Sequence, residues 1–442
     1  MRRIAVSLSI GLTACVSLLP RSVRADLDTY VKAPDPSFKY NVEKSFDVPG
    51  LASALSVRMT SQTWQGIAWQ HWVGIIRPEK VTHPEYVLLV VSGGSLKSEP
   101  QNPLAKEGIV LAGIAQKTGT IVAVVSQVPN QPLFEGLKED GLIAHTFVKY
   151  LDTKDETWPC LLPMTKSAVR AMDVVQAVVK EKYSEDVKKF VVTGASKRGW
   201  TTWLTGAVDS RVVAIAPMVI DTLNMGKQME LQRLSFGGFS EQIKDYTDRN
   251  LQKRLAEPES KRLLEIVDPY SYISRLTMPK LIVLGTNDRY WPVDAVKLYF
   301  SDLKGEKLLH YVPNAGHGLG PGAVEAVGAF YHTVINGTPR PQFTWDLKRD
   351  AKQATLSVDS KDKPEKIEIW QAAADTRDFR DAKWSGSPMS NGEPGKYTGS
   401  IPLPEKGFAA LHARLTFKGA LGQEYALSTN VEVLGDVQKK AD

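Results

Sequence analysis

The stretch that decides the fold reads Phe190-Val191-Val192-Thr193-Gly194-Ala195-Ser196-Lys197-Arg198-Gly199-Trp200. Its first four residues form an apolar, largely β-branched run that predicts a buried strand, and the residues from Trp200 to Leu204 predict the start of a helix. A strand that ends in a sharp Gly-x-Ser turn before a helix is the layout of a nucleophile elbow. The pattern therefore makes Ser196 a candidate nucleophile, exposed at the carboxyl edge of a sheet.

A plainer interpretation of the same residues is that Ser196 only caps the helix. The stretch also departs from the lipase pattern, because Arg198 stands where a second glycine is expected and the glycine comes one place later, at Gly199. In a working elbow, the backbone N–H of Lys197 would serve as one oxyanion donor. The rest of the chain has to decide between the two interpretations.

The first 25 residues have the composition of an export signal. Met1-Arg2-Arg3 is a basic start, residues 4–19 are apolar, and Val23-Arg24-Ala25 is a small-residue cleavage site. Alternatively, Leu12-Thr13-Ala14-Cys15 is a lipobox and Cys15 carries a lipid anchor. Both interpretations predict a periplasmic or secreted protein, since the apolar stretch is short for a membrane span. We favour cleavage after Ala25.

Composition excludes several classes of function. The 442 residues are 43% hydrophobic and 24% charged, as in soluble globular proteins, and the length suggests two folded domains. The net charge of +6 falls to +2 once the four arginines of residues 1–25 are removed, so charge is only weak evidence for a nucleic-acid or anionic partner. Cys160 then has no disulfide partner and is expected to be a buried apolar residue. Nucleotide and metal motifs are absent from the sequence, so no cofactor is predicted.

Apolar runs alternate with amphipathic stretches over residues 54–335. Strands are predicted over residues 54–64, 67–76, 86–91, 121–126, 190–193, 212–218, 281–285 and 308–312, and helices over 109–118, 164–183 and 324–335. This alternation predicts an α/β-hydrolase type of fold with a mostly parallel, doubly wound sheet. Residues 26–45 are predicted to be an extended arm, and the polar stretch of about 222–279 to be a helical lid insertion.

After Pro341 the pattern changes to short alternating runs separated by turns. Residues 355–358, 367–370, 409–417 and 425–433 are the clearest of these runs. They predict a small all-β sandwich. The expected organisation is a signal peptide over 1–25, a hydrolase domain over 26–340 and a β-sandwich domain over 341–442.

A serine hydrolase on this fold needs an acid and then a histidine after the serine in the chain. Asp288 follows the strand 281–285, and His317 follows the strand 308–312 on a loop of small residues. Both positions lie at the carboxyl edge of the sheet, where ligand chemistry gathers. His317 would accept the proton of Ser196, and Asp288 would orient the imidazole. Asp221, after the strand 212–218, is the alternative acid.

The second oxyanion donor is expected from the loop after the strand 86–91. That loop reads Ser92-Gly93-Gly94-Ser95. Glycines allow backbone N–H groups to approach a substrate oxygen closely. Gly94 and Ser95 are therefore the predicted donors beside Lys197.

With these residues in view, the chain resembles the PhoPQ-activated pathogenicity-related protein family. The resemblance covers about residues 30–435 and includes the elbow from Gly194 to Trp200. The other segments that carry it are Thr157-Trp158-Pro159, Leu162-Pro163-Met164, Arg170-Ala171-Met172-Asp173, Ile266-Val267-Asp268-Pro269 and Asn287-Asp288 before Pro292. It implies an exported bacterial protein with an α/β-hydrolase-like fold and does not fix a substrate. The Gly-x-Ser-x-x-Gly elbow is also similar to that of glucuronoyl esterases, which act on carbohydrate esters.

These observations predict an exported, cofactor-independent serine hydrolase that uses Ser196, Asp288 and His317. Its partner would be a small-molecule or peptide substrate, with neither a nucleic acid nor a membrane span beyond an anchor at Cys15. The lid and the appended β domain are typical of dipeptidyl-peptidase-like exopeptidases, whereas the elbow is similar to that of carbohydrate esterases. A non-catalytic secreted binding or signalling protein on the same fold is the alternative, because a fold does not guarantee a chemistry.

Overall fold

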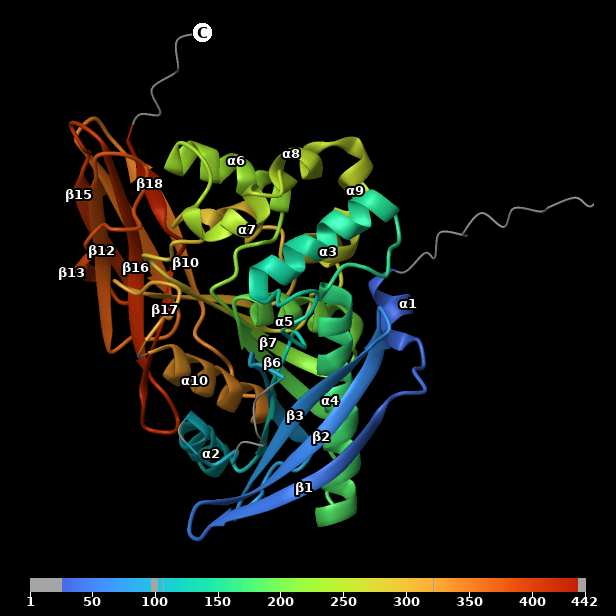
Figure 1. Ribbon diagram of the computed structural model, residues 1–442. Coiled ribbons are helices and arrows are strands. Elements are labelled where there is room, and N and C mark those ends of the chain that lie inside the picture. Colours follow the sequence, from blue (N-terminus) through green and yellow to red (C-terminus); the bar gives the residue numbers. More distant parts are fainter. Residues whose placement is uncertain (1–25, 97–101, 106, 321, 436–442) are drawn as a thin grey trace, which may run out of the picture.

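The computed structural model describes residues 26–96, 102–105, 107–320 and 322–435. A central sheet runs through the larger part of the chain, with helices on both of its faces. The C-terminal strands form a separate β layer along one side of this body (Figure 1). The expected fold class, an α/β-hydrolase fold with a C-terminal antiparallel β region, is confirmed.

The central sheet contains nine strands within the described residues, in the order β1-β2-β3-β5-β4-β6-β7-β8-β9. They are β1 (Lys39–Val48), β2 (Ala52–Trp64), β3 (Ile67–Pro78), β4 (Tyr86–Val91), β5 (Ile121–Val125), β6 (Lys189–Ala195), β7 (Val212–Met218), β8 (Lys280–Gly285) and β9 (Lys307–Val312). The pairs from β1 to β5 through β3 are antiparallel, and all pairs among β4–β9 are parallel. The parallel strands are continuous apolar runs because helices cover both of their faces.

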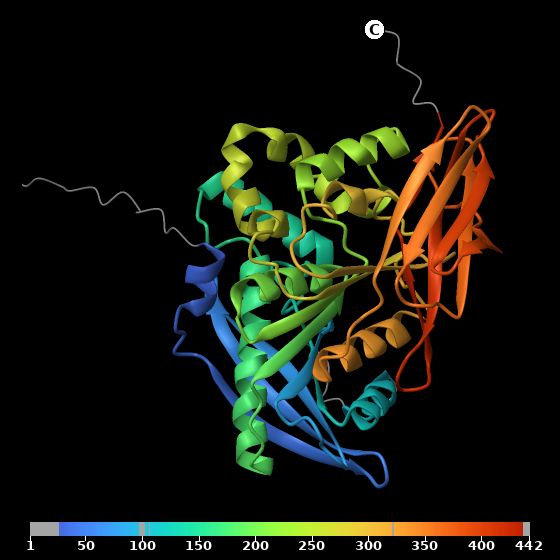
Figure 2. The same ribbon diagram turned by 180° about the vertical axis from the view of Figure 1, so that it is seen from behind.

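Helices on the two faces of the sheet complete the body. They are α1 (Leu27–Lys32), α2 (Glu107–Thr118), α3 (Glu139–Thr153), α4 (Leu161–Tyr183), α5 (Lys197–Val208) and α10 (Ala323–Ile335). In Figures 1 and 2, α4 and α5 lie on one face of the sheet, and α2 and α10 lie on the other. Each pair buries its apolar side chains in a separate core cluster.

The insertion between β7 and β8 is helical, as predicted. It contains α6 (Met225–Phe236), α7 (Lys244–Thr247), α8 (Leu251–Ala256) and α9 (Lys261–Val267), joined by short 3-10 turns. These helices gather beyond the carboxyl ends of the parallel strands, next to α3 (Figure 1). The insertion therefore covers the edge of the sheet where the elbow lies, and we call residues 222–279 the lid.

The C-terminal region forms two antiparallel sheets. One contains β10 (Phe343–Arg349), β11 (Gln353–Ser360), β15 (Lys396–Pro402) and β14 (Ser390–Glu393), and the other contains β13 (Ser385–Pro388), β12 (Lys366–Ala374), β16 (Phe408–Lys418), β17 (Glu424–Ser428) and β18 (Glu432–Leu434). Alternate residues of the facing strands are buried together, as in a sandwich. The region also packs on the body, where β17 contacts β9 and α10.

One expectation about local structure was wrong, and one helix was missed. Residues 26–45 are no extended arm, because the Asp26 carboxylate accepts a hydrogen bond from the Thr29 N–H and begins α1. Leu27 and Val31 of that helix are buried, and β1 then pairs with β2. Helix α3 was not predicted.

Cys160 is free and buried, as expected, and burial raises the pKa of its thiol. In the part of the chain that the structure describes, each helix is too short or too polar to span a bilayer. The predicted signal peptide and the lipobox at Cys15 lie outside the described residues.

Candidate active site

The elbow holds Ser196 in a conformation that few L-residues adopt. Its φ is +59° and its ψ is −125°, at the turn between β6 and α5. The turn is tight, since a Cβ added to Gly194 would lie 2.7 Å from the carbonyl oxygen of Arg198. A Cβ on Gly199 would lie 2.8 Å from the carbonyl oxygen of Met218. A glycine is thus required at position 199, one place later than in the lipase pattern, because α5 passes close to the end of β7 there.

The structure brings Ser196, His317 and Asp288 into one line of contacts. The Nε2 atom of His317 lies 2.8 Å from the Oγ atom of Ser196. Its Nδ1 atom lies 2.9 Å and 3.1 Å from the two carboxylate oxygens of Asp288. Asp288 is 6% exposed, so the contact of its carboxylate with the imidazole is shielded from solvent.

The fold alone brings these side chains together, since Ser196 and His317 are 121 residues apart in the sequence. Each stands on a loop that follows a parallel strand: β6 for Ser196, β8 for Asp288 and β9 for His317. A Cβ added to Gly285, the last residue of β8, would lie 2.4 Å from the carbonyl oxygen of Ala315. A glycine at that position lets the histidine loop approach the acid loop.

Tyr290 fixes the imidazole from a third side. Its ring centroid lies 4.2 Å from that of His317, with 31° between the ring planes. The backbone N–H of Tyr290 also donates a 2.9 Å hydrogen bond to the Asp288 carboxylate. Tyr290 was not predicted from the sequence, although an aromatic residue two places after the candidate acid was a usable signal.

The alternative acid, Asp221, does not contact His317. Its carboxylate is buried and accepts a 2.5 Å hydrogen bond from the hydroxyl of Tyr299. Burial raises the pKa of Asp221 to about 7, and the neighbouring carboxylates of Asp288 and Asp294 act in the same direction. The geometry therefore places Asp288 on the imidazole and gives Asp221 a different partner.

The predicted oxyanion loop lies directly beside the elbow. A Cβ added to Gly93 would lie 2.5 Å from the Arg198 guanidinium, so the loop touches the start of α5. Gly94 has a φ of +132°, and its carbonyl oxygen accepts a hydrogen bond from Gln131. Lys197 is the first residue of α5, where backbone N–H groups lack helical partners. The role of Lys197, Gly94 and Ser95 as oxyanion donors stays a prediction.

Asp140, in the first turn of α3, joins the elbow to the lid. Its carboxylate accepts hydrogen bonds from Lys197 Nζ at 2.7 Å, from the Tyr246 hydroxyl at 3.1 Å and from the Tyr290 hydroxyl at 3.3 Å. Tyr246 belongs to the lid, and Lys197 directly follows Ser196. Asp140 was not predicted as a site residue because α3, which carries it, was not predicted.

The preceding residue, Glu139, pairs with the next residue of the elbow. Both of its carboxylate oxygens accept 2.6 Å hydrogen bonds from Arg198. Burial acts to raise the pKa of Glu139, but Arg198 together with Gln131 and Lys197 outweighs it, so that pKa lies below its ordinary value. Two acids of α3 therefore neutralise the two cations that follow Ser196.

The C-terminal region holds the loops that carry Asp288 and His317. Asn287 Nδ2 donates to the carbonyl oxygens of Phe379, Arg380 and Ala382, at 3.3, 3.2 and 2.7 Å. Asn314 Nδ2 donates a 3.0 Å hydrogen bond to the carbonyl oxygen of Trp384, and the Trp384 N–H donates a 2.8 Å hydrogen bond to Asn314 Oδ1. The segment between β12 and β13 thus contacts both loops.

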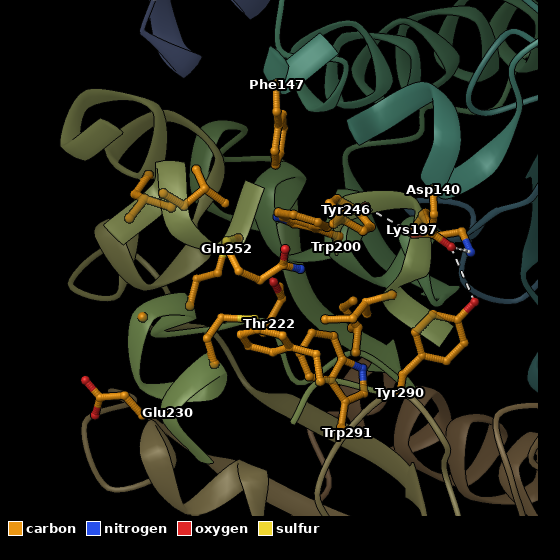
Figure 3. A pocket seen from close by; sticks show the side chains of 18 of the residues that line it. Asp140, Phe147, Lys197, Trp200, Thr222, Glu230, Tyr246, Gln252, Tyr290 and Trp291 are labelled. Carbon is orange, nitrogen blue, oxygen red and sulfur yellow. Dashed lines mark hydrogen bonds and ion pairs between the residues drawn. The ribbon is translucent and has the colours of Figure 1, made fainter. Parts of the chain in front are cut away.

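A cavity of about 540 Å³ opens beside Ser196 and His317. In Figure 3, the labelled Phe147, Trp200 and Trp291 border this space, while Asp140 and Lys197 lie at one side of it. Most of the remaining wall comes from the lid. Among the described residues, no three His, Cys, Asp or Glu side chains are grouped as they would be to hold a metal ion.

Comparison with protein families gives a match over most of the chain. A model of the PhoPQ-activated pathogenicity-related protein family matches residues 27–380. Autocrine proliferation repressor protein A of Dictyostelium discoideum is 31% identical over 472 aligned residues, which cover 98% of this chain and 93% of that protein.

Solved structures share the fold at low sequence identity. The acetyl xylan esterase of Paenibacillus sp. R4 is 17% identical and superposes with a TM-score of 0.51, over 70% of this chain and 92% of the esterase. Acetyl xylan esterase 1 of Thermoanaerobacterium sp. JW/SL YS485 is also 17% identical, with a TM-score of 0.46, over 70% of this chain and 93% of that chain. The likeness to the Paenibacillus protein shows an α/β-hydrolase fold.

Proposed function

The chain belongs to the PhoPQ-activated pathogenicity-related protein family and has an α/β-hydrolase fold. We propose that it is an exported serine hydrolase. One observation carries the proposal: Ser196 Oγ lies 2.8 Å from His317 Nε2, and His317 Nδ1 lies on the buried carboxylate of Asp288. A nucleophile, a base and a group that orients the base are the three parts that acyl transfer requires.

The reaction follows from these contacts. His317 Nε2 takes the hydroxyl proton of Ser196 as Oγ attacks the carbonyl carbon of an ester or peptide. The developing oxyanion is stabilised by the backbone N–H groups of Lys197 and of the loop at Gly94 and Ser95. His317 then gives the proton to the leaving alcohol or amine, and an acyl-enzyme remains on Ser196. Water, activated by the same imidazole, releases the acid and restores the serine.

The test is labelling of the purified protein with a fluorophosphonate, followed by mass spectrometry of the modified peptide. We expect the label on Ser196 and its loss in Ser196→Ala. In His317→Ala we expect labelling to slow by at least about a hundredfold, since the base that activates the serine is gone. A protein that unfolds cooperatively on heating but takes up no label would contradict the proposal.

A second candidate function is favoured by the name of the Dictyostelium relative, an autocrine proliferation repressor. A secreted protein of this fold could act by binding a receptor without hydrolysis. The Ser196→Ala variant separates the two. A signal that acts through binding keeps its effect on cell proliferation in this variant, whereas an effect that depends on hydrolysis is lost.

Export itself is part of the proposal and has its own test. Sequencing of the mature N-terminus from the exported protein should begin at Asp26. A mature protein that begins with a lipid-modified Cys15 would instead identify a lipoprotein, and a full-length protein retained in the cytoplasm would contradict export.

A further inference from the structure

The cavity beside Ser196 has a mainly apolar wall. Phe147 and Trp200 contribute aromatic rings from the body of the protein, and Met225 and Met229 come from α6 of the lid. The other apolar lining residues are Ile220, Phe239, Ile243, Leu255, Ala256, Leu264 and Trp291. Its volume of about 540 Å³ is in the range of cavities that enclose most of a small ligand. The group next to the reacting carbonyl therefore lies mainly against hydrocarbon, with Thr222 and Gln252 among the polar residues of the wall.

The charged groups nearest Ser196 are already paired with each other. Lys197 contacts Asp140 at 2.7 Å, and Arg198 contacts Glu139 through two hydrogen bonds. Two cations thus face two carboxylates. A substrate ammonium or carboxylate placed here would have to displace one of these partners or remain without a counter-ion, and both are costly away from water.

The polar groups farther out face the solvent. Glu230 has an exposed carboxylate that pairs with Lys227, and Arg233 is exposed on the same helix. In Figure 3, Glu230 lies apart from the aromatic rings that border the cavity. Apart from the Lys197–Asp140 ion pair, the acidic and basic residues of the lining therefore lie at the mouth of the cavity, and its interior favours an uncharged group.

We propose that the cavity binds the alkyl or aryl part of an uncharged ester, so that this hydrolase acts on apolar carboxylic esters. The inference rests on the proposed function, because it uses Ser196 as the nucleophile. In the reaction, the bond from Ser196 Oγ to the acyl carbon forms, the ester C–O bond breaks, and the serine proton leaves with the alcohol. Water then cleaves the acyl-enzyme to give the apolar acid.

The first test is a series of p-nitrophenyl esters from acetate to decanoate. Each methylene that enters the cavity is worth about 0.8 kcal/mol, so kcat/KM should rise by about fourfold per methylene until the cavity is full. Equal or falling kcat/KM along the series would overturn the inference. Faster turnover of acetylated xylose or of a dipeptidyl p-nitroanilide with a free amino group would also overturn it.

A bulky side chain at the exposed rim of the cavity gives a second test. Gly226 lines the cavity on α6, and a Cβ added there meets no atom within 4 Å. Gly226→Trp should lower the ratio of decanoate to acetate kcat/KM by at least about tenfold. The matched control is Gly113→Trp, since Gly113 also lies in a helix with open space around its added Cβ but is remote from the cavity lining. An unchanged ratio in Gly226→Trp would contradict the inference.

Labelling with fluorophosphonates of different chain length separates this inference from the proposed function. If neither an ethyl nor a decyl probe labels Ser196, the proposed function fails. If both probes label Ser196 at the same rate, the hydrolase assignment stands and the apolar specificity falls. Faster labelling by the decyl probe in the wild-type protein, lost in Gly226→Trp, supports both.

Discussion

Among single residues, those of the elbow were the most predictable from sequence. A glycine-flanked serine after an apolar run is a local signal, and the structure gives Ser196 the positive φ that such a turn needs. Asp288 and His317 could be proposed because each follows a strand in the expected chain order. Tyr290 and Asp140 could not be placed in this way, since their roles depend on contacts between loops distant in the chain.

The acid that serves His317 can be identified by exchanging carboxylates for amides. Asp288→Asn should lower kcat by about 10³- to 10⁴-fold, because it loses the group that holds the imidazole in its productive tautomer. Asp221→Asn should lower kcat by less than about tenfold, since an amide oxygen still accepts the hydrogen bond from Tyr299. Ester hydrolysis and fluorophosphonate labelling measure both. A larger loss in Asp221→Asn would reverse the assignment.

Asp221 should also make the stability of the protein depend on pH. The folded state keeps its proton up to a pKa of about 7, whereas the unfolded chain releases it near the ordinary value of 3.8. The folded state therefore binds more protons between these values, and the contribution of Asp221 to stability falls as pH rises from about 4 to about 7. Asp221→Asn removes this fall, which amounts to up to roughly 4 kcal/mol.

Urea unfolding of both proteins at pH 4, 5.5, 7 and 8 measures the effect. The free energy of unfolding of Asp221→Asn, relative to the wild-type protein, should increase up to pH 7 and then stay constant. Parallel curves for the two proteins would contradict the prediction.

Among the elements, strands were predicted better than the segments that position the site. The predicted strands 86–91 and 212–218 coincide with β4 and β7. Helix α3 was missed even though Leu142, Phe147, Tyr150 and Leu151 of its sequence are apolar and buried at helical spacing. The Pro-rich loop before it and Gly141 near its start masked this spacing. Because α3 carries Asp140, missing it also hid the contact between elbow and lid.

Asp140→Asn should loosen the lid. The substitution removes the carboxylate that balances Lys197 and leaves one oxygen to accept from Tyr246 and Tyr290. Loss of one member of a buried ion pair costs about 3–5 kcal/mol, and residues 244–256 should exchange their amide hydrogens faster. Chemical denaturation and hydrogen exchange by mass spectrometry measure the two effects.

The control for this variant is Asp245→Asn, next to Tyr246 in the chain. Asp245 is about half exposed and pairs only loosely with Arg249, so its loss should cost less than about 1 kcal/mol. Equal exchange in the two variants would show that Asp140 does not hold the lid.

In the molecule as a whole, the change of sequence pattern at residue 341 marks the point where the α/β architecture gives way to antiparallel strands. It does not mark a C-terminal region that packs apart from the body. Ala372, Phe379, Trp384, Ala410 and Val431 of the C-terminal region belong to the same apolar cluster as the body of the hydrolase. Alternating runs could predict the strands, because alternation is a local property. They could not predict this packing, which joins segments distant in the chain, and the domain division at 340 remains a prediction.

The shared packing predicts that the C-terminal region contributes to catalysis by positioning the acid loop. Asn287 precedes Asp288, and its amide nitrogen is held by three carbonyl groups of the segment 379–382. Asn287→Ala removes these contacts without touching Ser196, His317 or Asp288. The stability should fall by about 1–3 kcal/mol, since part-buried carbonyl groups lose their donor.

If Asn287 has only a structural role, Asn287→Ala lowers stability and leaves kcat unchanged. If Asn287 positions the acid loop, the substitution also lowers kcat. A small displacement of the acid relative to the imidazole should reduce kcat by about 10- to 100-fold with little change in KM, because substrate binding lies mainly with the lid and not with this loop. The comparison is Asn336→Ala, which loses a hydrogen bond from an asparagine amide to a carbonyl at the end of α10, remote from the site. If both variants lose stability and keep the wild-type kcat at a temperature where both are folded, the C-terminal region supports the fold alone. A loss of kcat confined to Asn287→Ala means that the acid of the site is aligned from outside the α/β unit that carries it.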